Sequence, residues 1–235
     1  MKNSFCIFRF TLLFVLLICI LALCSWIGSI YDVGEVQSLL GTEGVRWILG
    51  HVAEDYVKEP ALRNVMILLM GVGIAVRSGL SGTLRKVCQK GRKLSRKERR
   101  ALSLSSISFF MYWSFVVVGL LLPWNLLLGV TGSLLHSPFM KGLVFVLSLS
   151  AGLAGMVYGY VIGTFRSVLD VMKSMSFLLS SVASYFVSLF FIVLFFSALD
   201  YSYLVEWLGI SDNLVLWIRQ FCCYSPLLFY LLKTK

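Results

Sequence analysis

Long apolar runs constrain this chain more than any other feature, because each run is about as long as the hydrocarbon core of a bilayer is thick. A helix needs about 20 apolar residues in a row to cross that core. Of the 235 residues, 59% are hydrophobic and only 14% are charged, and a soluble domain of this length could not bury so much apolar surface. The sequence therefore predicts an all-α polytopic transmembrane helix bundle, with residues 1–235 forming a single membrane domain.

About six spans are expected. They cover residues 5–30, 61–80, 101–122, 142–163, 180–199 and 213–232. The first apolar run is too long for a signal peptide and lacks a small-residue cleavage site, so we expect it to be retained. The stretch 168–199 exceeds one straight span, so a short piece should precede the fifth. Arg219 lies in the sixth segment, and a five-span alternative leaves that segment as a surface helix.

An acidic segment, residues 31–60, follows the first span and holds six of the chain's eleven acids. Apolar residues recur there at helical spacing and predict an outer amphipathic helix over about residues 42–57. They are Val45, Ile48, Leu49, Val52 and Tyr56. Thr42 is expected to cap the helix, and Glu43 suits the positive end of its dipole. Two placements are open: flat in the outer membrane interface, or packed on the bundle as a lid.

A basic segment, residues 81–100, carries nine lysines and arginines against the single acid Glu98. The net charge of +10 would point to nucleic acid in a soluble protein. Here the charges cluster between two spans, so the positive-inside rule explains them as a cytoplasmic loop and no nucleic-acid partner is expected. Both termini then lie in the cytoplasm. Anionic-lipid binding is the alternative role. Ser95 and Glu98 form a capping box that opens the next helix.

Four glycines lie close to one face of the fourth span: Gly152, Gly155, Gly159 and Gly163. Small residues at this spacing let helix backbones approach closely. Helix packing is therefore the favoured interpretation, and a substrate path lined by glycine is the alternative.

Ionisable or amide side chains within the spans are few and lie near span ends. They are Asn64, Arg77, Asp170 and Arg219. Such groups mark ion or substrate paths when they lie deep in lipid. Placement at the membrane interface is the simpler interpretation for all four, so no proton relay is predicted.

No catalytic, cofactor-binding or metal-binding residue is predicted, and the chain is not expected to be an enzyme. Residues 79–82 read GLSG, like the GxSG around membrane serine-protease nucleophiles, but Ser81 would need a histidine base. His51 and His136 are both predicted on the other side of the membrane. Six cysteines lack metal-binding spacing and are interpreted as apolar fillers. They are Cys6, Cys19, Cys24, Cys88, Cys222 and Cys223.

Three stretches, in the same order, resemble the p-aminobenzoyl-glutamate transporter (AbgT) family. Residues 38–80 resemble that family's SGEGIRW outer helix and the span that ends GVA-x-x-SGL. Residues 94–122 open with LSRKERRAL, like the stretch that enters a later span of the family. Residues 137–210 run from SPFMKGLVF through GMVYGYVIGTFRS to LDYSYLVEWLGI. This third stretch is similar to the family's SPF…G, GIVYG-x-x-x-GT, MSxMxSYIVLAFF and F-x-W-x-x-LG series.

The resemblance implies a transporter of the bacterial inner membrane, a homodimer that moves a small organic anion such as p-aminobenzoyl-glutamate. Family members are longer, with further spans and a re-entrant hairpin where residues 92–94 stand here and a second hairpin after residue 210. The family's transport site is placed in those hairpins, so no binding residue carries over. The alternative is a non-transporting dimeric scaffold, or a partner subunit for another membrane protein, that assembles through the glycine face of the fourth span.

Overall fold

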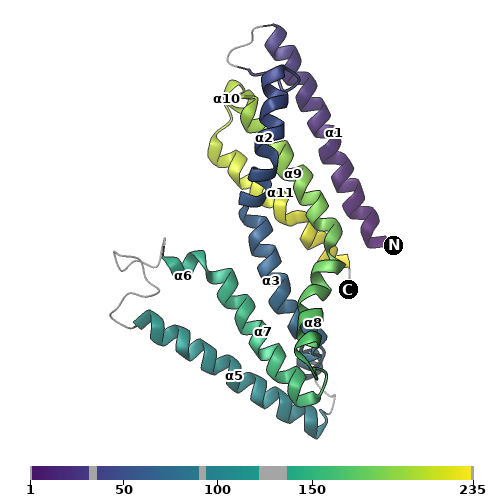
Figure 1. Ribbon diagram of the computed structural model, residues 1–235, viewed down its shortest axis with the longest axis vertical. Coiled ribbons are helices and arrows are strands. Elements are labelled where there is room, and N and C mark those ends of the chain that lie inside the picture. The colour runs from purple at the N-terminus through teal and green to yellow at the C-terminus, as the bar shows by residue number, and fades with distance from the viewer. Residues whose placement is uncertain (1, 32–35, 90–93, 122–136, 234–235) are drawn as a thin grey trace. The chain divides into compact units, whose positions relative to one another are not determined.

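The computed structural model describes residues 2–31, 36–89, 94–121 and 137–233, and over these residues it contains eleven helices and no strand (Figure 1). The all-α prediction is confirmed. The chain divides into two compact units, one made of Met1–Arg63 with Val182–Lys235 and the other of Asn64–Ser181. The single membrane domain stays a prediction.

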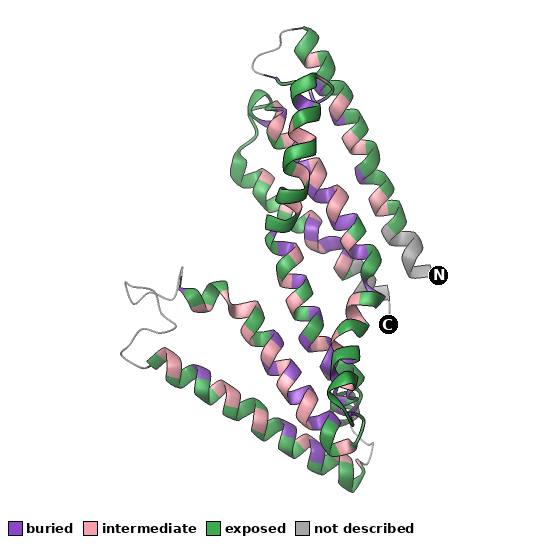
Figure 2. Ribbon diagram, in the orientation of Figure 1, coloured by how far each residue is buried: buried purple, intermediate pink, exposed green. Residues whose placement is uncertain are grey.

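Five of the described helical segments are long and apolar enough to cross a bilayer, by length and composition. They are Phe8–Ile30, Pro60–Arg77, Arg96–Leu121, Leu143–Ile162 and Ala183–Tyr201, and they match the first five predicted spans. The sixth predicted span falls on α11 (Asp212–Lys233), which is not among the five, and it stays a prediction. Much of α5 (Arg96–Leu121) is coloured as exposed in Figure 2. Its large apolar residues Phe115 and Leu121 are 77% and 79% exposed. Such faces fit a lipid environment.

In the first unit, α1 (Lys2–Ile30) and α11 pack against α9 (Ala183–Tyr201). The hydroxyls of Thr11 and Ser188 lie 2.6 Å apart in a hydrogen bond between α1 and α9. The Tyr185 hydroxyl donates to the carbonyl oxygen of Cys223 at 3.0 Å and so joins α9 to α11. A short helix, α10 (Leu204–Trp207), follows α9. Because these hydroxyls find partners on neighbouring helices, they satisfy their hydrogen bonds without water.

Pro226 lies inside α11. Its ring nitrogen carries no hydrogen, so it cannot donate to the carbonyl of Cys222, four residues earlier. The Ser225 hydroxyl donates to that carbonyl at 3.3 Å instead. The backbone acceptor that the proline would orphan is therefore satisfied within the helix.

The predicted amphipathic helix is α2 (Thr42–Lys58), and it packs on α9. The Trp47 ring stacks on Tyr201 with centroids 4.6 Å apart, and the Tyr56 hydroxyl donates to the carbonyl of Phe186 at 3.0 Å. Of the two placements left open, the structure therefore has the helix packed on the bundle.

The predicted apolar face of α2 is only partly packed on the bundle, and the predicted N-cap is wrong. Leu49 is 81% exposed and Val45 is also exposed, whereas Gly44 is buried. The Trp47 stack turns the packed face away from Val45 and Leu49. The N-cap is Gly41 rather than Thr42, and its extended backbone leads into the helix without a side-chain cap.

The second unit holds most of α3 and the helices that follow it up to α8. Their bounds are α3 (Pro60–Arg77), α4 (Leu80–Cys88), α5, α6 (Pro138–Lys141), α7 (Leu143–Ile162) and α8 (Val168–Ser181). α5 and α7 pack along each other, and the Ser105 hydroxyl donates to the carbonyl of Ala154 at 2.8 Å. Tyr158 of α7 is buried and hydrogen-bonds to Thr83 of α4.

α3 and α7 approach each other backbone to backbone. The α-carbon of Gly71 faces the carbonyl of Ser148, and a Cβ at Gly155 would lie 2.8 Å from the Cα of Ala75. The helix-packing interpretation of the glycine face is thus confirmed. The contact is made within the chain, however, so this face is not open for the assembly that the scaffold alternative placed there. Gly163 has a φ of 90° and ends α7.

The basic segment, predicted as a cytoplasmic connection between spans, is partly helical, since α4 ends at Cys88 and α5 begins at Arg96. Its cytoplasmic placement stays a prediction. Gly79, with a φ of 89°, separates α3 from α4, and only a few residues lie between α4 and α5. The Ser95 N–H donates to the Glu98 carboxylate at 2.9 Å, as a capping box requires. The expected interruption in residues 168–199 is confirmed, since α8 ends at Ser181 and α9 begins at Ala183.

Candidate functional site

A buried carboxylate lies at the junction of α2 and α3. Glu59 is the last residue before Pro60, and a residue in that position is driven from the helical to the extended region. Its backbone adopts a φ of −61° and a ψ of 120°, so α2 ends there. Only 7% of Glu59 is exposed. A carboxylate in such surroundings needs a charged partner, because burial of an unpaired charge is very costly.

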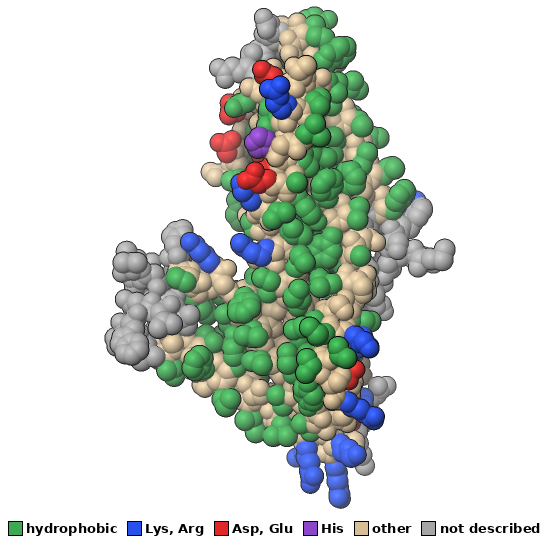
Figure 3. All heavy atoms as spheres, in the orientation of Figure 1, with side chains coloured by type: hydrophobic (Ala, Val, Ile, Leu, Met, Phe, Trp, Pro, Cys, Tyr) green, Lys and Arg blue, Asp and Glu red, His purple; other side chains and the backbone are tan. Residues whose placement is uncertain are grey.

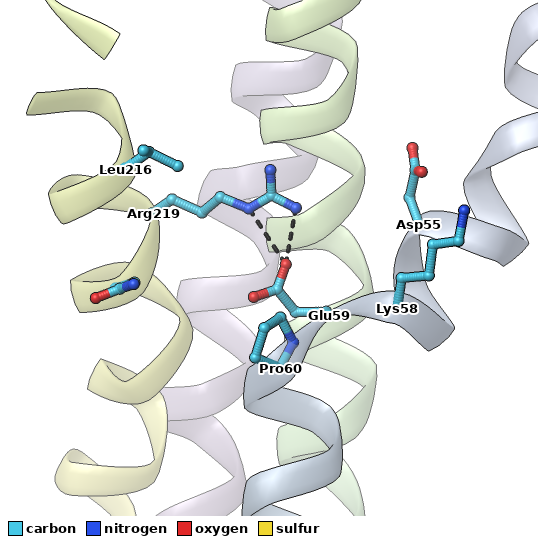
Figure 4. A pocket seen from close by; sticks show the side chains of 7 residues that line it. Asp55, Lys58, Glu59, Pro60, Leu216 and Arg219 are labelled. Carbon is cyan, nitrogen blue, oxygen red and sulfur yellow. Dashed lines mark hydrogen bonds and ion pairs between the residues drawn. The ribbon is translucent and has the colours of Figure 1, made fainter. Parts of the chain in front are cut away.

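Arg219 of α11 supplies that partner (Figure 4). Its Nη2 and Nε donate to the same oxygen, Oε2 of Glu59, at 2.7 and 3.2 Å. Its Nη1 donates at 3.5 Å to Oδ2 of Asp200, near the end of α9. The short contact with the buried acid is strong, and the long contact with the more exposed acid is weak. One guanidinium therefore links three elements of the first unit.

Two cavities flank this guanidinium, and both are lined by Leu216 and Arg219. One, of about 230 Å³, is also lined by Asp55, Lys58, Glu59, Pro60 and Gln220. The other, of about 210 Å³, is also lined by Asp200, Tyr203, Val205, Glu206, Asp212 and Val215. Two acids face two bases in the first cavity, whereas three acids face one base in the second. A small anion is therefore better accommodated by the first cavity, and the second repels it.

Lys58 is paired outside the guanidinium cluster. Its Nζ lies 2.5 Å from Oε1 of Glu54, one turn earlier on α2. A hydrogen bond from Lys58, and then its positive charge, lowers the pKa of Glu54, and the same contact raises the pKa of Lys58. Both side chains are more than half exposed, so the pair adds little stability. Figure 4 shows Lys58 and Asp55 directed away from the Glu59–Arg219 pair.

Two other predicted polar residues have structural roles at helix ends. Arg77 closes α3, where its Nη1 donates to the carbonyl of Lys173 at 3.3 Å and its guanidinium lies 5.6 Å from the centroid of the Phe177 ring. Asp170 accepts the backbone N–H groups of Arg166 and Ser167 at 3.0 and 3.1 Å at the start of α8. These hydrogen bonds lower the pKa of Asp170.

Asn64 lies half-buried on α3. Of the four polar residues singled out in the spans, only Arg219 is part of a buried charge cluster.

The protease-like motif gains no base among the described residues. Ser81 is exposed in the first turn of α4, and no hydrogen bond there joins it to a histidine. The His51 ring contacts the Trp47 carbonyl at 3.2 Å and stacks on the Trp47 ring. His136 lies outside the described residues.

Over the part of the chain that the structure describes, no three His, Cys, Asp or Glu side chains could hold a metal ion. The five cysteines described there are free: Cys19, Cys24, Cys88, Cys222 and Cys223. The side chain of Cys6 lies outside that description.

Sequence reasoning missed Glu59 and Asp200 as partners of Arg219. A signal was present, since an arginine inside an apolar segment needs an acid. Glu59 and Asp200 are the acids that border the predicted second and fifth spans. The choice among the acids of the acidic segment depends on packing, which periodicity does not give.

Comparison with known proteins identifies a matching family and solved structures of similar fold. A family model described as the AbgT putative transporter family matches residues 7–94 and 85–231. The crystal structure of the Alcanivorax borkumensis YdaH transporter is 18% identical, with a TM-score of 0.76, and the match covers 85% of this chain and 73% of that one.

Neisseria gonorrhoeae MtrF, described with a class of antimetabolite efflux pumps, is 16% identical with a TM-score of 0.75. That match covers 95% of this chain and 80% of MtrF. At such identities the likeness shows the fold alone. No curated protein matches the chain.

Proposed function

The chain belongs to the AbgT putative transporter family, and from this premise we propose that it moves a small organic anion, such as p-aminobenzoyl-glutamate, across the bacterial inner membrane. The proposal includes a homodimer with both termini in the cytoplasm and no catalytic or cofactor chemistry. Family membership supports the transport class. The choice of an organic anion rests on the resemblance of the sequence and on one structural observation, the guanidinium of Arg219 beside a cavity.

Arg219 has the chemistry that carboxylate binding requires. A guanidinium presents a planar set of N–H donors that matches the two oxygens of a carboxylate. Its contacts with Glu59, at 2.7 and 3.2 Å, hold the side chain in place. The contact of Nη1 with Asp200 is long, at 3.5 Å, and Asp200 is 58% exposed. A substrate carboxylate would replace this weak contact and leave the buried pair intact.

The charges around the guanidinium favour one approach. In the cavity of about 230 Å³, Gln220 offers a donor, and acids and bases balance. In the cavity of about 210 Å³ the acids outnumber the single base. A substrate carboxylate would thus approach Arg219 from the first cavity and draw the guanidinium away from Asp200, which lines the other cavity. Loss of that weak contact would change the link between α9 and α11. Such an exchange of ion-pair partners is a local event that can bias two arrangements of a helix pair.

Flux through proteoliposomes tests the proposal. Purified protein is reconstituted alone, and uptake of p-aminobenzoyl-glutamate is measured with and without an imposed pH gradient. We expect saturable uptake, and we expect Arg219→Lys, which keeps the charge but loses the planar fork, to raise the half-saturating concentration at least tenfold. Arg63→Lys is the matched control, because Arg63 is exposed at the start of α3. The absence of saturable uptake by folded wild-type protein would contradict the transport proposal.

The alternative is a non-transporting dimeric scaffold or partner subunit. Its glycine-face interface is excluded, because that face of α7 packs on α3 at Gly155 and Ala75. The exposed apolar face of α5, with Phe115 and Leu121, is the surface that favours the alternative now. Folded, dimeric protein without flux, together with crosslinking between cysteines placed at Phe115 of two copies, would support it.

A further inference from the structure

An apolar cavity of about 390 Å³ lies in the second unit between α5 and α7, with walls from α3 and α4. Its lining includes Leu80, Leu84, Leu102, Ser106, Phe110 and Ala154. The volume is in the range of small-ligand pockets, roughly 300–1,000 Å³. Leu84 and Phe110 are 48% and 69% exposed, so the cavity opens to its surroundings. In a membrane protein those surroundings include acyl chains.

A basic cluster adjoins one end of this cavity. Arg96, Lys97, Arg99 and Arg100 occupy the first turns of α5, and Arg85 follows Leu84 on α4. Figure 3 shows basic side chains gathered at the end of the second unit where α5 begins. The Nζ of Lys86 lies 2.7 Å from Oε1 of Glu98, and this ion pair joins α4 to α5 beside the cavity. Glu98, the acid in the cluster, is thus already paired with Lys86.

Helical geometry selects one residue of the cluster. At about 100° per residue, Arg99 lies within about 20° of the line through Ser106 and Phe110, whereas Lys97 lies about 180° from Ser106. Arg99 also precedes Ser106 by about 10 Å along the axis. The cavity wall formed by α5 therefore leads to Arg99, which is exposed and can turn its guanidinium toward a headgroup.

We propose that this cavity and Arg99 form a binding site for one anionic phospholipid, with an acyl chain in the cavity and the phosphate at the guanidinium. An apolar cavity with a cationic end is complementary to an anionic amphiphile in both shape and charge. An orientation signal alone requires basic residues in the segment but no cavity in line with one of them. The site is separate from the Arg219 cluster, and its test does not depend on transport.

Lipid binding to the purified full chain tests the site. The protein, in a neutral detergent, is titrated with phosphatidylglycerol or phosphatidylcholine, and bound lipid is counted by native mass spectrometry. We expect one phosphatidylglycerol per chain to be retained in preference to phosphatidylcholine. Arg99→Gln should weaken phosphatidylglycerol binding about fivefold, the effect of one basic residue near an anionic surface. Lys97→Gln, with the same charge change on the opposite face, should change it less than twofold.

Ser106→Leu fills the cavity without altering charge and should also reduce retention of phosphatidylglycerol. Equal losses in Arg99→Gln and Lys97→Gln would overturn the site in favour of diffuse attraction to the basic segment. Equal retention of the two lipids would overturn the role of charge, and displacement by equimolar inorganic phosphate would show a phosphate site rather than a lipid site. If Ser106→Leu fails to fold, the comparison of Arg99→Gln with Lys97→Gln decides.

Discussion

The two units hold their helices together by different means. In the unit Asn64–Ser181, α3 and α7 meet backbone to backbone, with Gly71 against the carbonyl of Ser148 and Gly155 against Ala75. In the other unit, α11 is joined to α9 and to the α2–α3 junction by long side chains that converge on Arg219. The α3–α7 contact depends on the absence of side chains at the glycines, and the Arg219 contact depends on ion pairs between charged side chains.

This difference has a consequence for function. Helices that meet through small residues are held by van der Waals contact over a matched surface, and that surface has no second partner to exchange. An ion pair can exchange one carboxylate for another, because the guanidinium recognises the group rather than the residue. The Arg219 cluster is therefore the part of the described chain better suited to respond to an anion, and the α3–α7 contact is better suited to stay fixed.

Removal of Arg219 should have the largest effect. Arg219→Met leaves the Glu59 carboxylate buried without its partner, and the free energy of unfolding should fall by about 3 kcal/mol, at the low end for a broken buried pair because Arg219 is partly exposed. Denaturation of the purified protein in mixed micelles measures the change. Lys58→Met breaks an exposed pair instead and should cause little change.

The double variant Glu59→Leu with Arg219→Met sharpens this result. It removes both charges, so most of the stability lost in the single variant should return. If the two substitutions prove additive, the buried pair is not the source of the loss, and the contrast between the two units would fail at its central point.

Gly155→Ala should have the next largest effect, through the other kind of contact. The added Cβ would lie 2.8 Å from the Cα of Ala75, and backbone atoms cannot move aside as a side chain can. Overpacking of this kind costs about 1–3 kcal/mol. At Gly82 a Cβ would meet nothing within 4 Å, so Gly82→Ala should stabilise α4 by up to about 1 kcal/mol. Equal effects of the two variants in the same denaturation assay would contradict the close approach of α3 and α7.

Hydropathy alone predicted most of the fold, because the length and polarity of a span are local properties of the sequence. The first five predicted spans coincide with helices that are long and apolar enough to cross a bilayer, and the interruption near Val182 is confirmed. The local errors have tertiary causes. The packed face of α2 follows the stack of Trp47 on Tyr201, and these two residues are far apart in the chain.

Less of the candidate site than of the fold could be predicted from the sequence. Arg219 could be singled out because a charge in an apolar segment is unusual. Its main partner, Glu59, lies 160 residues away, among six acids of similar appearance. The glycine spacing on α7 correctly indicated a close helix contact, but spacing does not reveal whether the partner helix belongs to the same chain.

Hydroxyl bridges between helices should contribute equally in the two units, and loss of either should have a small effect. Tyr185→Phe removes the bond to the Cys223 carbonyl, and Ser105→Ala removes the bond to the Ala154 carbonyl. Each should cost about 0.6 kcal/mol, the average for a hydrogen bond between helices in a membrane. A much larger loss in one variant would show that this unit depends on its hydroxyls, and the contrast between glycine contact and ion pair would then need revision.

The smallest effect should come from Asp170, and it should depend on pH. Hydrogen bonds from the N–H groups of Arg166 and Ser167 hold the pKa of Asp170 below its ordinary value of 3.8. The carboxylate therefore stabilises the start of α8 fully above about pH 4, and this contribution is lost as the pH falls through the lowered pKa. The difference in thermal stability between wild-type protein and Asp170→Asn should be the same at pH 7 and at pH 5, and it should shrink below pH 4. Asp212→Asn, in the first turn of α11, is the matched control from the other unit. A wild-type advantage over Asp170→Asn that does not shrink as the pH falls below 4 would show that the carboxylate charge does not stabilise α8.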